Sequence, residues 1–146
     1  MTIHSEQNSG LSESQEDYLE AILLIEEAKS SAHAREIARQ MSVTGASVTG
    51  ALRILARKKL VHYTPYAPVR LTPSGRTAAR SISRRHNALR DFFLQALRAT
   101  PEEAEHCACR LEHVLPIRFL KRLAGLCPFS SFSAAAARRP SQGSPS

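Results

Sequence analysis

The segment Cys109-Arg110-Leu111-Glu112-His113 places three side chains that bind metals close together in the chain. On a helix, Glu112 lies three residues and His113 four residues after Cys109, so a thiolate, a carboxylate and an imidazole share one face. These are the ligand types of divalent transition metals. An amphipathic helix with a partly buried cysteine and a hydrogen-bonded histidine has the same spacing, and on this segment alone both interpretations remain open.

Two other places in the chain carry side chains of the same kinds. Asp17 and Glu20 lie one turn apart in the first predicted helix, and His86 lies in the middle of a long one. Taken singly, they are equally well read as solvated acids and a surface histidine beside the basic pair Arg84-Arg85. Taken with the segment at Cys109, they favour a metal site.

Basic residues are concentrated in the middle of the chain. Residues 1–30 hold seven acids and one base, residues 31–100 two acids and thirteen bases, and residues 101–146 four acids and six bases. The formal net charge of +7 therefore comes from the middle. A confined basic region is typical of a surface that binds nucleic acid, because neutralised phosphates release counterions. A solvated basic surface is the alternative.

A helix predicted over residues 46–59 carries side chains suited to DNA. Short hydroxyl side chains and a glycine stand at its N-terminal end, where they would let the helix sit deep in the major groove, and basic side chains follow. Arg70, on a neighbouring element, would add a phosphate contact. The candidate DNA-binding residues are Thr44, Ser47, Thr49, Gly50, Arg53, Arg57, Lys58 and Arg70.

Helical periodicity and start signals set out the elements that position these residues. Ser12 with Gln15, Thr72 with Pro73, and Thr100 with Pro101 are predicted helix starts. Val43 and Val48 are expected to be buried, and Ser42 to occupy a turn where positive φ favours glycine. We expect helices over residues 13–28, 34–41, 46–59, 73–98, 101–113 and 117–126, and strands over residues 60–63 and 69–72.

A helix-turn-helix followed by a small hairpin is a winged helix. Five motifs then resemble, in order over residues 11–127, the diphtheria toxin repressor and manganese transport regulator family. They are Glu16-Asp17-Tyr18-Leu19-Glu20, the helix-turn-helix with Ser47-Val48-Thr49, the wing end Leu71-Thr72-Pro73-Ser74-Gly75, Arg85-His86, and Cys109-Arg110-Leu111-Glu112-His113.

The resemblance implies a mainly α protein in which a winged helix-turn-helix DNA-binding domain is joined to a helical metal-binding and dimerisation domain, without the SH3-like domain of longer members. We expect these domains over residues 11–75 and 76–127, between a flexible N-terminus at 1–10 and a disordered tail at 128–146. The metal ligands implied by the resemblance are Asp17, Glu20, His86, Cys109, Glu112 and His113.

The implied cofactor is Mn²⁺ or Fe²⁺, with Zn²⁺ or Co²⁺ able to replace it in vitro. Manganese-type members carry an acid where Cys109 stands, and iron-type members carry Met where Asp17 stands, so this chain is a hybrid. A thiolate shifts preference toward softer ions. Arg90 replaces a carboxylate of the iron-type second site, although Glu105 could still help to bind a second ion.

The implied function is that of a cytoplasmic, homodimeric repressor of manganese or iron uptake genes that binds double-stranded palindromic operator DNA. No apolar run is long enough to span a membrane, the start of the chain is not a signal peptide, and no catalytic motif suggests an enzyme or a small organic substrate. Three alternatives remain: a winged-helix regulator that senses oxidants through Cys107 or Cys109, a small metallohydrolase, and a structural dimer module.

Overall fold

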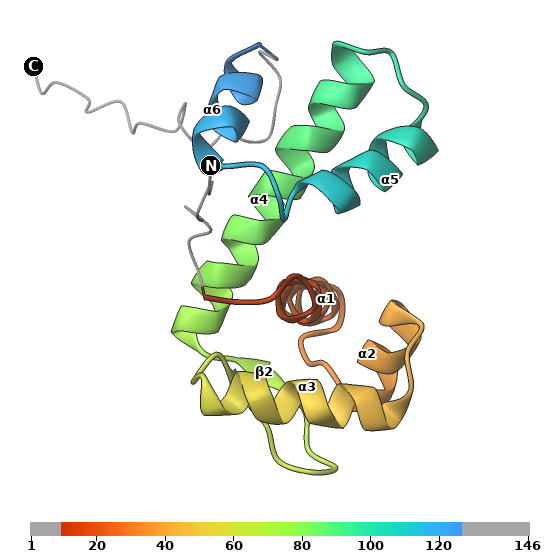
Figure 1. The fold of residues 1–146 in the computed structure, drawn as a ribbon. Helices are drawn as coiled ribbons and strands as arrows, with labels where there is room; N and C mark the ends of the chain where they lie inside the picture. The colour runs from red at the N-terminus through yellow and green to blue at the C-terminus, as the bar shows by residue number, and fades with distance from the viewer. Residues whose placement is uncertain (1–9, 127–146) are drawn as a thin grey trace, which may run out of the picture. The chain divides into compact units, whose positions relative to one another are not determined.

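The computed structural model describes residues 10–126, and these divide into two compact units at the boundary between Ser83 and Arg84. The elements are α1 (Glu13–Lys29), α2 (Ala34–Met41), α3 (Gly45–Arg57), β1 (Val61–His62), β2 (Arg70–Leu71), α4 (Pro73–Gln95), α5 (Pro101–Leu111) and α6 (Ile117–Leu126), as Figure 1 shows. The predicted mainly α fold is confirmed. Except for Gly10, the N-terminus and tail expected at residues 1–10 and 128–146 lie outside the described residues.

The N-terminal unit (residues 10–83) is the winged helix. Helices α1, α2 and α3 and the β1–β2 hairpin surround one aliphatic core, in which Leu19, Ile22, Ile37 and Leu52 are fully buried. Ser12 caps α1 through the predicted capping box, in which its side chain accepts from the Gln15 amide and Gln15 accepts from the Ser12 amide. Each helix in this unit therefore buries one apolar face against the same core.

In the turn between α2 and α3, the predicted conformation of Ser42 is confirmed, but the predicted burial of Val43 is not. Ser42 adopts the left-handed conformation with φ 55° that was predicted for it. Val48 is fully buried as expected, whereas Val43 is 37% exposed, so its predicted burial is wrong. The Val43 amide donates to the Ala38 carbonyl at the end of α2, and the next residue, Thr44, is the N-cap of α3.

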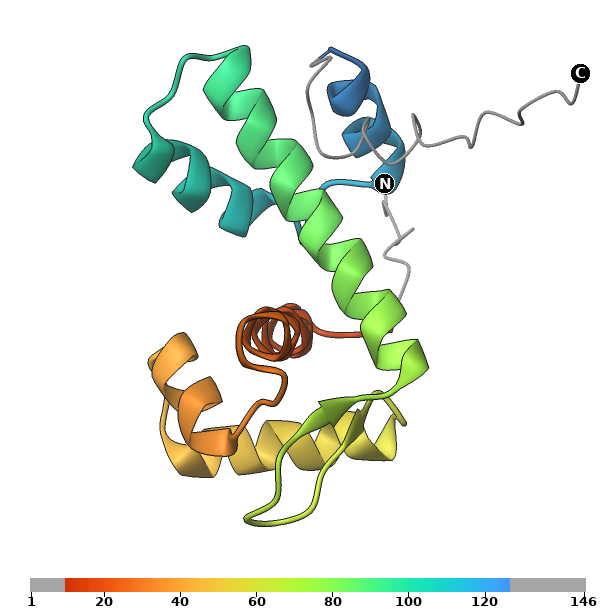
Figure 2. The same ribbon diagram turned by 180° about the vertical axis from the view of Figure 1, so that it is seen from behind.

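The wing is short and is anchored at its base. Val61 pairs with Leu71 and His62 with Arg70, so each strand has two paired residues rather than the predicted four. The Val69 amide donates to the Ala32 carbonyl, which joins the wing to the segment between α1 and α2. The wing loop projects past α3, on the side away from α1 (Figures 1 and 2).

Gly75, in the first turn of α4, permits a close approach to Leu60, in the segment between α3 and β1. A Cβ atom at this position would lie 1.8 Å from the Leu60 carbonyl oxygen, which only a missing side chain avoids. Thr72 caps the helix, since its hydroxyl accepts from the Gly75 amide at 3.0 Å and also donates to the Lys59 carbonyl. The predicted start of α4 is therefore confirmed, with a tertiary reason for its glycine.

The C-terminal unit, described over residues 84–126, contains the second part of α4 together with α5 and α6. Leu89, Ala108 and Leu120, one from each helix, form its buried centre. Helix α4 ends at Gln95 rather than at residue 98, and Arg98 has φ 54°, which a right-handed helix cannot include. Among the described residues, no helix combines the length and apolar character needed to cross a bilayer.

Candidate metal centre and nucleic-acid interface

A cluster of metal-binding side chains lies within the C-terminal unit, where α4 faces the end of α5. His86 comes from α4, Cys109 from α5, and Glu112 and His113 from the turn that ends α5. The capping box of Thr100 and Glu103, with Pro101 in the first turn, fixes where α5 begins and thereby which of its residues face α4. Four of the six predicted ligands are brought together in this way.

The two nitrogens of His86 both face carboxylates. His86 Nδ1 lies 2.7 Å from Glu112 Oε2, and His86 Nε2 lies 2.9 Å from Glu105 Oε1. The Cys109 sulfur lies 3.9 Å from His86 Nδ1 and 4.0 Å from Glu105 Oε1. One ligand atom each from His86, Glu105 and Cys109 lies within 4.8 Å of the others, so nitrogen, oxygen and sulfur donors converge without any helix having to move.

Glu112 is the most deeply buried charged residue of the cluster. It is 1% exposed, and its recorded partners among the described residues are imidazoles, His86 and, at 3.2 Å, His113. Both histidines are 6% exposed. A buried carboxylate is costly unless a positive charge compensates it, and either protonated imidazoles or a bound cation can supply that charge. The donor set therefore fits a divalent cation.

The other two predicted ligands belong to the N-terminal unit. Asp17 and Glu20 both lie on α1, one turn apart and half-buried. Tyr18 between them is buried in the core of that unit, and burial raises the pKa of its phenol, so it stays neutral at neutral pH. Whether α1 completes the cluster remains a proposal, taken up below.

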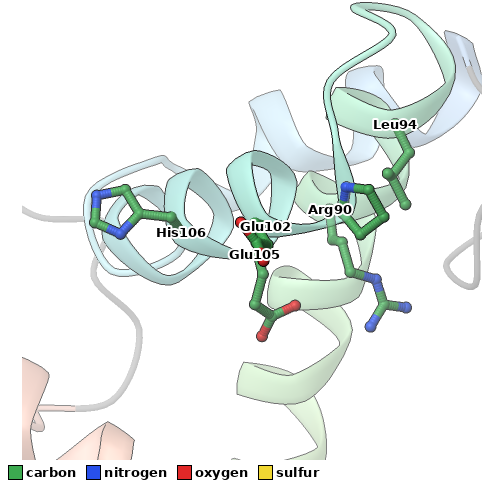
Figure 3. A pocket seen from close by; sticks show the side chains of 6 residues that line it. Arg90, Leu94, Glu102, Glu105 and His106 are labelled. Carbon is green, nitrogen blue, oxygen red and sulfur yellow. The ribbon is translucent and has the colours of Figure 1, made fainter.

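Glu105 is the residue that the sequence analysis connected only with a possible second ion. It precedes Cys109 by four residues on α5, and this i, i+4 spacing is the signal that could have placed it on the same helix face as Cys109. Glu105 and Arg90 also line a hollow of about 550 Å³ between α4 and α5, where their side chains project to the same side (Figure 3). Cys107 is half-buried and Cys109 exposed.

The exposed face of α3 carries most of the predicted DNA-binding residues. Val48, Leu52 and Leu55 bury one side of the helix, which leaves Gly50, Arg53 and Arg57 on the opposite side. The space around the Gly50 Cα is open. Small residues followed by arginines along one exposed face suit a helix that enters the major groove and is held by backbone phosphates.

The other predicted residues surround this face, and some have structural roles. Thr44 caps α3, its hydroxyl accepting from the Ser47 amide at 3.2 Å. Ser47 is exposed, Thr49 half-buried, and Arg70 exposed on β2. Lys58 donates to the Gly10 carbonyl at 2.8 Å and to Gln15 Oε1 at 3.0 Å, so it ties α3 to the start of α1. Its predicted DNA contact competes with that role.

Two protein-family models match the chain. Residues 10–69 match the N-terminal DNA binding domain of iron dependent repressors, and residues 72–139 match their metal binding and dimerisation domain. The two matches together span both units of the structure.

Individual relatives agree with these matches. An uncharacterized HTH-type transcriptional regulator of Methanocaldococcus jannaschii is 34% identical over 77% of this chain and 91% of its own. The HTH-type transcriptional regulator MntR of Geobacillus thermodenitrificans is 30% identical over 80% of this chain and 82% of its own. A solved manganese-dependent transcriptional repressor in complex with manganese is 29% identical with a TM-score of 0.73; the match covers 79% of this chain but only 53% of that one.

Proposed function

The chain belongs to the diphtheria toxin repressor and manganese transport regulator family of metal-dependent transcriptional repressors, and from this we propose that a divalent cation controls its affinity for operator DNA. The observation that carries the proposal is the cluster around Glu112. A carboxylate that is 1% exposed stands between two imidazoles, with a cysteine thiol close by. Burial of this carboxylate requires a compensating positive charge, and a bound divalent cation would supply it.

The proposed ligands are Asp17, Glu20, His86, Cys109, Glu112 and His113. A bound cation would supply positive charge beside the buried Glu112 carboxylate, and its ligands would come from both units. Carboxylates suit Mn²⁺, and the Cys109 thiolate favours Fe²⁺ or another softer ion. Glu105 lies close enough to His86 Nε2 either to replace a ligand or to orient the imidazole ring.

The mechanism depends on which unit each ligand belongs to. Asp17 and Glu20 are carried by the winged helix, and His86, Cys109, Glu112 and His113 by the other unit. A shared coordination sphere would limit how the two units reorient. The ligand side chains therefore act on DNA affinity without touching DNA, by restricting the orientations that the winged helix samples.

Dimerisation makes that restriction important. In a symmetric dimer the two α3 helices must enter major grooves about 34–36 Å apart, on a palindromic operator. Limiting the motion of each winged helix removes arrangements that miss this spacing. The coupling is reciprocal, so operator DNA should tighten metal binding by the same factor, typically equivalent to about 1–3 kcal/mol. We further propose a cytoplasmic repressor of manganese or iron uptake genes.

The test is a titration of metal against DNA binding. A duplex that binds the protein is first selected from random-sequence DNA in the presence of Mn²⁺ or Fe²⁺. We expect its affinity to rise by a factor of about 5 to 150 when metal is added, and chelation to reverse the gain. An affinity that does not change between the metal-loaded and the chelated protein would falsify the proposal.

The role of Cys109 is tested with a panel of metals under anaerobic conditions. Cys109→Glu should move the response toward Mn²⁺ and away from softer ions, because a thiolate is exchanged for a carboxylate. Cys107→Ser is the matched control. An unchanged rank order of metals would mean that Cys109 is not a ligand. A response to oxidant that ignores chelators would instead support the thiol-sensing alternative, which the exposure of Cys109 permits.

A further inference from the structure

A hollow of about 440 Å³ lies between α3 and the wing, within the N-terminal unit. Its lining consists of Arg53, Ala56 and Arg57 from α3, and Tyr63 and Pro65 from the segment that follows β1. The wing loop lies on the same side of the unit as the exposed face of α3 (Figure 2). The hollow therefore opens where a DNA backbone would pass between α3 and the wing.

The charge of the hollow is entirely positive. Arg53 and Arg57 are one turn apart, both are exposed, and no acidic residue is part of the lining. Arg76 and Lys29, in the same unit, have carboxylate partners in Glu26 and Glu36. Within the described part of the chain, no ion pair is recorded for Arg53 or Arg57. Two unpaired guanidinium groups beside one hollow have the geometry of an anion site.

Tyr63 gives the hollow a fixed wall. Its ring is half-buried and packs against the core of the winged helix. The phenol hydroxyl is the one polar atom of that side chain, and it can donate a hydrogen bond to an anionic oxygen. Because the ring is held by the core, the donor loses little conformational freedom on binding.

We propose that this hollow seats one phosphodiester of the DNA backbone, held by the guanidinium groups of Arg53 and Arg57 and the hydroxyl of Tyr63. The inference rests on the proposed DNA-binding function and adds a specific contact to it. A phosphate held between α3 and the wing fixes the depth and register of α3 without reading sequence. Tyr63 is accordingly a DNA-binding residue of this chain, in addition to the eight predicted from sequence.

The test uses the full chain loaded with metal, the selected duplex and a scrambled duplex of the same composition. Tyr63→Phe keeps the packed ring and should weaken binding to both duplexes by the same factor, about 3- to 10-fold, with an unchanged salt dependence. The double variant Arg53→Gln/Arg57→Gln should reduce the magnitude of the slope of log K against log salt by about 0.9, because one phosphate is no longer neutralised. Arg80→Gln, an exposed arginine of α4 outside the hollow, is the matched control and should leave the slope unchanged.

A neutral methylphosphonate at each backbone position in turn identifies the phosphate. We expect wild type to lose affinity at one position in each half-site, and Tyr63→Phe and Arg57→Gln to lose less affinity there than wild type does. If the variants and the wild type lose the same affinity at every methylphosphonate position, the hollow does not bind a phosphodiester.

Inorganic phosphate separates the two possible sources of the anion. If Tyr63→Phe and Arg57→Gln abolish binding of inorganic phosphate but leave DNA affinity unchanged, the hollow is a site for a free phosphate compound and the proposal is wrong. If the wild-type protein binds no selected duplex, both the proposed DNA-binding function and the phosphate site are wrong. If the wild type binds normally and the variants bind equally well, only the phosphate site is wrong.

Discussion

At the scale of single residues, the glycine at position 50 lowers the stability of α3 and leaves space on its exposed face. Gly50 lies within a helix, where glycine costs about 0.5–1 kcal/mol relative to alanine. The structure shows no packing reason for it, since nothing lies within 4 Å of where its Cβ would be. Under the proposed function, the approach of DNA to the exposed face of the helix gives a reason for this glycine.

Gly50→Ala should therefore stabilise the protein and weaken DNA binding. We expect the free energy of unfolding in urea to rise by about 0.5–1 kcal/mol. The added methyl group should lower affinity for the selected duplex. Gly125→Ala, within α6 and equally open, is the control for the stability gain at a site outside α3. An unchanged affinity for Gly50→Ala would mean that α3 does not approach DNA along this face.

Ser42 is the opposite case, a residue in a conformation that glycine adopts more readily. With φ 55° it ends α2 in the left-handed region. Ser42→Gly should raise the free energy of unfolding by about 0.5–1 kcal/mol, because the left-handed strain disappears. Ser74→Gly, in the first turn of α4, should instead destabilise, since no strain exists there to relieve. Equal effects of the two substitutions in urea unfolding would contradict this explanation.

At the scale of elements, α1 holds the wing through one buried carboxylate. The Glu26 side chain is 7% exposed, and it accepts hydrogen bonds from the Leu71 amide at 2.9 Å and from the Arg76 guanidinium. The amides on both sides of Arg70 are therefore bonded to the α1 region, Val69 to Ala32 and Leu71 to Glu26. The wing base depends on this pair of attachments.

Glu26→Gln tests that attachment. The amide can still accept from Leu71, but it loses its charge beside Arg76, so we expect a loss of about 1–3 kcal/mol in the free energy of unfolding. Affinity for DNA should also fall, because Arg70 is held less firmly. Glu27→Gln, at the neighbouring exposed position, should change neither quantity by more than about 0.5 kcal/mol. The measurements are urea unfolding and DNA titration. If Glu26→Gln changes neither the free energy of unfolding nor the DNA affinity, this carboxylate does not hold the wing.

At the scale of the whole molecule, metal binding should raise the free energy of unfolding. A cation that binds the folded chain and not the unfolded one adds about 2.7 kcal/mol at a concentration of 100 times its dissociation constant. Lower pH should remove this gain, because histidine binds metal when neutral and cysteine when ionised. The proposed ligands His86, His113 and Cys109 would each be protonated in acid.

Thermal unfolding with and without Mn²⁺ or Fe²⁺ measures this linkage. We expect Glu112→Gln to abolish the metal-dependent rise in midpoint temperature, since it removes the buried carboxylate at the centre of the cluster. Glu102→Gln, an exposed acid on the same helix, should keep the full rise. If Glu112→Gln is stabilised by metal as strongly as wild type, the cluster is not the metal site.

The sequence by itself determined the features that depend on residues close together in the chain. Helix starts at Ser12, Thr72 and Thr100 follow from side chains that cap amides three residues away. Tertiary structure alone decided contacts between distant residues, such as Glu26 with Arg76, His86 with Glu105, and Tyr63 beside Arg57. It also decided that Val43 is exposed. Local spacing contains no information on which helix faces meet, because only packing of the whole core selects them.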